Sequence, residues 1–129
     1  MKTLVFGAST KPQRYSYTAI NRLRDFGHEV VAIGLREGLV ADVELMTGHP
    51  DISDIHTITM YLSPPRQGDH IDYLLGLSPQ RIIFNPGTEN EIFAQKAREQ
   101  GIEALEACTL VLLSTGQYEL MEKNISVRH

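Results

Sequence analysis

The sequence predicts an α/β fold in which helices cover both faces of a parallel sheet of about five strands. Short apolar runs rich in β-branched and aromatic residues alternate with segments whose apolar positions repeat at helical spacing. Glycines and prolines separate these segments. The start of the chain reads as strand, glycine turn, helix, glycine stop and strand, a βαβ unit of about thirty residues. Repeated alternation with right-handed crossovers is typical of a Rossmann-like domain.

The first βαβ unit begins with a strand at 4–6 that ends in Gly7, where the backbone can turn or admit a ligand. Ser16 is the expected cap of the next helix, and Gly27 is its expected left-handed stop. The second predicted strand covers 29–33. The helix positions expected to be buried are Ala19, Ile20, Leu23 and Phe26.

The later elements follow the same alternation, with Pro64 and Pro65 ending a strand and Gly101 ending a helix. Thr88 and Glu91 have capping-box spacing, which predicts a helix start at Thr88. The predicted elements are a turn at 34–38, a short extension or edge strand within 39–46, strands at 57–62, 81–84 and 102–106, and helices at 68–77, 88–100 and 109–113. The positions expected to be buried in the helices are Ile71, Leu74, Leu75, Ile92, Phe93 and Ala97. The polar tail after Tyr118 is expected to fray.

Length and composition favour one domain over residues 1–129, since 42% of the residues are hydrophobic and 22% are charged. The net charge of −4 argues against sequence-independent nucleic-acid binding, which needs a basic face. No apolar run is long enough to cross a membrane, and no signal peptide is evident. A single cysteine fits a reducing compartment, so we expect a cytoplasmic protein. The oligomeric state stays open, with a homodimer among the options.

The loop at 7–12 is the first candidate binding site, because a helix N-terminus with free N–H groups after a strand binds phosphates. Ser9 and Pro12 replace two glycines of the dinucleotide fingerprint. The second strand also lacks the acidic residue that holds a ribose in NAD enzymes; Gly34 and then Arg36 follow it. Arginine here favours a phosphate on or near the ribose, and a solvated turn residue is the alternative.

Other strand ends meet at the same edge of a parallel sheet: 62–64, 85–87 and 106–108. Pro64 and Pro65 terminate a strand and also present free carbonyls and an apolar rim. Cys108 is interpreted as a structural thiol, because no signature supplies a partner base. The five histidines lack metal-ligand spacing, so no metal site and no catalytic residue is predicted.

Several of these runs together resemble the small bacterial CoA-binding proteins. They are Gly7-Ala8-Ser9 with Lys11, the run at 27–31, Asn85-Pro86-Gly87, Gly101-Ile102-Glu103 and Glu106-Ala107-Cys108. Such stand-alone domains are similar to the N-terminal CoA-binding domain of the succinyl-CoA synthetase alpha subunit.

The resemblance implies that the loop at 9–12 holds phosphates, and that Arg36 stands where the synthetase places a lysine. It also implies that 62–64 lies along the ligand. The second and third strands depart from the small proteins' pattern, ending in Ile33-Gly34-Leu35 and Thr59-Met60-Tyr61-Leu62. The synthetase's phosphorylated histidine belongs to a further domain, so ligase activity is not implied.

We therefore predict non-catalytic binding of coenzyme A or an acyl-CoA. A first alternative is an NAD(P)-dependent reductase that uses the same edge, with Arg36 on a 2′-phosphate. A second is a protein-interaction module that has lost the ligand. The predicted cofactor-binding residues are Gly7, Ala8, Ser9, Thr10, Lys11, Pro12, Gly34, Arg36, Leu62, Ser63, Pro64, Asn85, Pro86 and Gly87.

Overall fold

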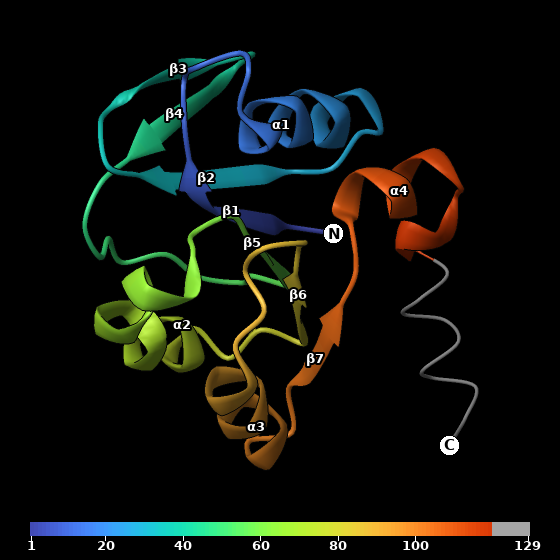
Figure 1. Ribbon diagram of the computed structural model, residues 1–129. Helices are drawn as coiled ribbons and strands as arrows, with labels where there is room; N and C mark the ends of the chain where they lie inside the picture. The colour runs from blue at the N-terminus through green and yellow to red at the C-terminus, as the bar shows by residue number, and fades with distance from the viewer. Residues whose placement is uncertain (120–129) are drawn as a thin grey trace.

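A computed structural model describes residues 1–119 and contains one seven-stranded sheet (Figure 1). The strands are β1 (Thr3–Ala8), β2 (Val30–Gly34), β3 (Gly38–Val40), β4 (Val43–Met46), β5 (Thr57–Met60), β6 (Arg81–Phe84) and β7 (Glu103–Glu106). Their order across the sheet is β3-β4-β2-β1-β5-β6-β7. All neighbouring pairs are parallel except β3 and β4, which are antiparallel.

Helices cover both faces of this sheet, as expected for a Rossmann-like fold. The helices are α1 (Tyr15–Asp25), α2 (Ile71–Gly76), α3 (Glu91–Glu99) and α4 (Thr109–Ser114), with short 3₁₀ turns η1 (Pro64–Arg66) and η2 (Gly68–His70) before α2. In Figure 1, α1 and α4 lie on one side of the sheet and α2 and α3 on the other. The predicted fold class is confirmed.

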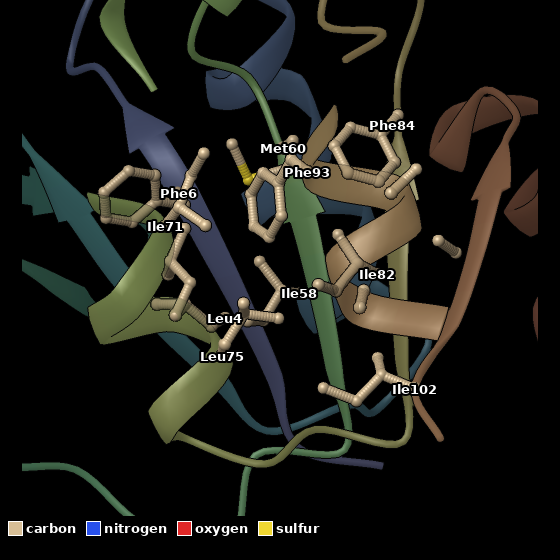
Figure 2. Packing of buried hydrophobic residues seen from close by; sticks show 14 of the residues in the cluster. Leu4, Phe6, Ile58, Met60, Ile71, Leu75, Ile82, Phe84, Phe93 and Ile102 are labelled. Atoms are coloured by element: carbon tan, nitrogen blue, oxygen red, sulfur yellow. The ribbon is translucent and has the colours of Figure 1, made fainter. Parts of the chain in front are cut away.

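Two hydrophobic cores explain why the central strands are apolar at consecutive positions. Leu4 and Phe6 of β1 pack toward α2 and α3, whereas Val5 packs toward α1 and α4. Successive side chains of a strand point to opposite faces, so β1, which is buried on both faces, carries apolar residues at consecutive positions. Figure 2 shows the first core, in which the rings of Phe84 and Phe93 meet edge to face with centroids 5.3 Å apart.

The sheet has seven strands where about five were predicted, because the segment predicted as a short extension or edge strand within 39–46 forms a two-stranded hairpin. Strands β3 and β4 turn at Ala41 and Asp42, and Ala41 has a positive φ of 55°. This turn contains no glycine, so the usual hairpin signal is missing from the sequence. The Arg24 guanidinium holds the Asp42 carboxylate with bonds of 2.8 and 2.7 Å, which attaches the hairpin to α1.

Two predicted helix starts are wrong. Arg14, not Ser16, occupies the N-cap position of α1, and Ser16 is buried within the first turn. Helix α3 begins after Asn90, whose Oδ1 accepts a hydrogen bond from the Phe93 N–H at 3.1 Å. Thr88 is not the cap, because its hydroxyl donates to the Asn85 carbonyl. Asn and Thr are both good helix caps, so the sequence does not distinguish Asn90 from Thr88; in the structure their contacts with Gln67 and Asn85 do.

Most predicted helix faces and stops agree with the structure. Gly27 and Gly101 both have positive φ directly after a helix, as predicted. Phe26 and Ile92, predicted to be buried, are 48% and 69% exposed. Each lies at a helix end, where its side chain does not pack against the sheet. The prediction of a fraying tail after Tyr118 falls almost entirely on residues 120–129, which lie outside the described residues.

Candidate functional site

The candidate site lies at the carboxyl ends of β1 and β5, where the strand order changes direction. From β1 the chain continues to β2 on one side, and it later returns to β5 on the other side. In open α/β sheets the loops that leave such a switch point diverge to opposite faces and leave a crevice for ligands. The predicted residues 7–12 and 62–64 follow these two strands.

Gly7 brings the backbones of the two loops into direct contact. Its φ is +92°, and a β-bulge between Phe6 and Ala8 shifts the pairing of β1 with β2. A Cβ atom at this position would lie only 2.7 Å from the Leu62 nitrogen and 2.8 Å from the Tyr61 carbonyl carbon. Glycine is therefore required here by conformation and by space.

The turn that carries Arg36 packs against the same loop. A Cβ atom on Gly34 would collide with the Ala8 carbonyl oxygen, and one on Gly38 would collide with the Thr10 side chain. The structure thus brings the loop at 7–12 and the turn at 34–38 together, as the sequence predicted. Arg36 is exposed within this turn.

The loop at 7–12 ends in the N-terminus of α1, which presents favourable electrostatics for an anion. The 11-residue helix α1 has no acidic residue in its first turn, and the Arg14 side chain makes no capping bond within residues 1–119. Ser9 Oγ accepts a hydrogen bond from the Lys11 N–H at 3.1 Å, which shapes the loop. Lys11 is exposed, so its ammonium group is available to a ligand.

Gln67 joins the loop after β5 to the loop after β6, and sequence analysis missed it. The residue is 0% exposed, and its Nε2 donates to the carbonyls of Leu62 (2.9 Å) and Thr88 (2.8 Å). Its Oε1 accepts from Asn90 Nδ2 at 2.9 Å. Gln67 lies in a polar stretch after two prolines, which resembles an ordinary surface loop and gives no signal of burial.

Asn85 lies at the predicted edge, but its side chain is buried and forms hydrogen bonds within the protein. It is 2% exposed, and its Nδ2 donates to Thr59 Oγ1 (2.7 Å) and to the Met60 carbonyl (2.8 Å). Its Oδ1 accepts from the Thr109 N–H at 2.8 Å, which caps α4 from another part of the chain. Pro86 and Gly87 are exposed, so these two residues rather than Asn85 can face a ligand.

The same edge contains a buried tyrosine hydroxyl and the cysteine thiol. Burial strongly raises the pKa of the Tyr61 hydroxyl, so this group stays protonated at neutral pH. Cys108 is half-buried at the N-cap position of α4.

Residues 1–119 contain no group of three or more His, Cys, Asp or Glu side chains able to hold a metal ion. No helix in this described range is long and apolar enough to cross a membrane.

The order β2-β1-β5-β6-β7, with helices on both faces, defines a doubly wound α/β protein of the class that binds ligands at its carboxyl edge. The family model described as a CoA binding domain matches residues 1–114. The chain therefore belongs to this CoA-binding domain family.

Solved structures share the fold of this chain. A protein described as uncharacterized is 42% identical, with a TM-score of 0.88, and the match covers 91% of this chain and 97% of that one. A hypothetical protein from Pyrococcus horikoshii OT3 is 21% identical, with a TM-score of 0.75 and coverage of 83% and 77%. A protein from Thermus thermophilus is 19% identical, with a TM-score of 0.80 and coverage of 91% and 90%. The last two matches show the fold alone. No protein of curated function matches the sequence.

Proposed function

We propose that residues 1–129 act as one unit that binds coenzyme A or an acyl-CoA and performs no chemistry of its own. The observation that carries this proposal is the meeting of the loop at 7–12, the start of α1 and the Arg36 turn at the switch point. These elements offer backbone N–H groups, a helix N-terminus and two cationic side chains, a donor set suited to a ligand with several phosphates. Family membership supports CoA among such ligands.

In this proposal the loop at 7–12 holds the diphosphate, and Arg36 contacts the 3′-phosphate of the ribose. The turn after the second strand of such a fold lies beside the adenosine ribose, which is why we assign Arg36 to that phosphate. Residues 62–64 and the exposed Pro86 and Gly87 form the walls along the rest of the ligand. The proposal includes Gly34, whose contact with Ala8 keeps the Arg36 turn beside the phosphate loop.

Direct binding measurements with CoA, NADH and NADPH test the proposal. A ligand that binds only the native state stabilises it by about 2.7 kcal/mol at a hundred times Kd, so saturating CoA is expected to raise Tm by several degrees. NADH at the same concentration is expected to have little effect, because β2 does not end in the acidic residue that holds the ribose in NAD enzymes; Arg36 is the first charged residue after it. An unchanged Tm with CoA, or a larger shift with NADPH, would show that the proposed ligand is wrong.

Arg36→Ala is expected to weaken CoA binding roughly ten- to a hundredfold, as expected for a lost charged hydrogen bond. Its effect on dephospho-CoA is expected to be small, because that ligand lacks the phosphate that the guanidinium would contact. Isothermal titration calorimetry with both ligands and both proteins completes a double-mutant cycle.

Arg22→Ala is the matched control, because Arg22 is an exposed arginine in the last turn of α1, away from the carboxyl edge. We expect it to bind both ligands like the unmodified protein. Equal losses for CoA and dephospho-CoA in Arg36→Ala would mean that Arg36 supports the turn rather than contacting the phosphate. Glu37→Gln in the same experiment checks whether the neighbouring carboxylate pairs with Arg36 and reduces the effect.

A further inference from the structure

Two histidines from distant parts of the chain share a hydrogen bond beside the candidate site. His49 follows β4, and His70 ends η2, immediately before α2. The distance between His49 Nε2 and His70 Nδ1 is 2.8 Å. Both residues follow strands of the parallel sheet at their carboxyl ends, so the pair lies at the same edge as the candidate site.

Further contacts make the pair part of a packed cluster. The ring of His49 stacks on that of Tyr73 with centroids 4.3 Å apart and an interplanar angle of 6°. The Tyr73 hydroxyl donates to the Pro50 carbonyl, and the His70 ring meets the Phe6 ring edge to face. The loop that starts at residue 47 is thereby fastened to the beginning of α2.

The cluster is also connected to the proposed ligand wall. The backbone N–H of His70 donates to the backbone carbonyl of Gln67 at 2.9 Å, and the Gln67 side chain donates to the Leu62 carbonyl. The segment 62–70 is therefore fixed from inside by Gln67 and from outside by the His49–His70 bond. Loss of the outer contact would leave segment 62–70 held by the Gln67 side chain and by the contact of the His70 ring with Phe6, without its tie to the loop that carries His49.

The bond between the rings requires one nitrogen to accept and the other to donate. A neutral or singly protonated pair meets this requirement, whereas two imidazolium rings offer only donors and repel each other. Burial, and then the charge of His49, lower the pKa of His70, while Asp69 opposes the shift. The other ionisable groups around the pair are Tyr73 and Asp72 of α2 and, lining the same pocket as His49, Asp51 and Asp54.

The consequence for stability follows from the direction of this shift. A histidine whose pKa is lowered on folding binds protons less well in the native state than in the unfolded state. The contribution of His70 to the free energy of unfolding is therefore largest above the unfolded histidine pKa of about 6.5. It is lost as the pH falls below that value.

We propose that the His49–His70 pair is a proton-operated latch on the ligand wall: it is closed at neutral pH and opens when both rings are protonated, which lowers the affinity of the neighbouring edge for CoA. The ligand half of this inference rests on the proposed function, whereas the latch itself does not.

The test compares the unmodified protein with His49→Gln, whose amide can still donate to His70 but cannot be protonated. Kd for CoA is measured by calorimetry at about pH 7.5 and about pH 5.5, on either side of an ordinary histidine pKa. We expect the loss of affinity between these conditions to be roughly three- to tenfold larger in the unmodified protein, the range for one linked proton. Titration of the CoA phosphates affects both proteins equally and cancels in the ratio. Equal losses in the two proteins would overturn the coupling to the ligand.

A ligand-free measurement keeps the latch testable if CoA does not bind. Amide hydrogen exchange is followed at Arg66, Gln67 and His70, whose backbone N–H groups donate within segment 62–70. It is measured at the same two pH values, and protection factors remove the intrinsic pH dependence. We expect protection to fall at least threefold in acid in the unmodified protein and to stay constant in His49→Gln. His49→Phe, which keeps a ring over Tyr73 but has no nitrogen, is expected to show low and pH-independent protection. Equal pH dependence in all three proteins would overturn the latch, whereas failure of CoA to bind at neutral pH would overturn only the proposed function.

Discussion

Gly7→Ala is expected to lower the free energy of unfolding by about 2 to 6 kcal/mol, the sum of a strained backbone conformation and an overpacked contact. The new methyl group would enter the space now held by the Leu62 nitrogen and the Tyr61 carbonyl carbon, both of which are backbone atoms. Backbone atoms at the ends of two paired strands cannot move aside as the end of a flexible side chain can. Urea denaturation followed by circular dichroism measures the change.

Gly27→Ala is the matched control for this substitution. Gly27 has a positive φ of 83°, close to that of Gly7, but no atom lies within 4 Å of a Cβ built there. Gly27→Ala is therefore expected to lower the free energy of unfolding through conformational strain alone, by about 1 to 2 kcal/mol. The difference between the two variants isolates the contact between the loops after β1 and β5. Equal destabilisation would mean that this close approach does not occur in solution.

Asn85→Ala is expected to destabilise the protein by about 2 to 5 kcal/mol, because two buried backbone groups each lose a hydrogen bond to its side chain. The Thr109 N–H would lose the Asn85 Oδ1 acceptor, and the Met60 carbonyl would lose the bond from Asn85 Nδ2. Thr59 Oγ1 would retain the Thr109 hydroxyl at 2.8 Å, so it contributes little to the cost. Urea denaturation is again the measurement, with an unchanged m-value as the sign of two-state unfolding.

Asn21→Ala controls for the general effect of replacing asparagine by alanine. Asn21 Nδ2 donates to the Tyr17 carbonyl within α1, and alanine has the higher helix propensity. We expect a change within about 0.5 kcal/mol, as for substitutions away from buried networks. A cost for Asn85→Ala as small as that of Asn21→Ala would contradict the role of Asn85 as the buried link between β5, β6 and α4.

The elements that the sequence predicted best are those whose periodicity is set by burial. Strand β6 and the stripe at Ile71, Leu74 and Leu75 were predicted where the structure has them, because apolar spacing directly reflects which face packs on the sheet. The β3–β4 hairpin was not predicted, because its turn has Ala41 at a positive φ where a glycine would have indicated a hairpin turn. Helix ends were also less certain, because Thr88 and Asn90 are both competent caps in the sequence.

The sequence predicted which segments share the carboxyl edge of the sheet, but not what their side chains contact. Parallel strands end at one edge, so their order in the sequence is enough to place residues 7–12, 34–36 and 85–87 along it. Whether a polar side chain at that edge faces outward depends on partners far away in sequence. Asn85 faces Thr59 and Thr109, and Gln67 bridges two loops from a segment with no periodic signal.

One contact at this edge means that the free protein already holds an anion there. The Glu89 carboxylate accepts a hydrogen bond from the Gly87 N–H at 2.8 Å, so a side chain of the same loop occupies this donor. Any phosphate or carboxylate that uses the Gly87 N–H must first displace Glu89. The affinity observed at this position is then the intrinsic affinity multiplied by the fraction of molecules in which Glu89 has moved away. For a ligand that uses the Gly87 N–H, Glu89 would be a tethered competitor, and the ligand would have to be the better acceptor of that hydrogen bond.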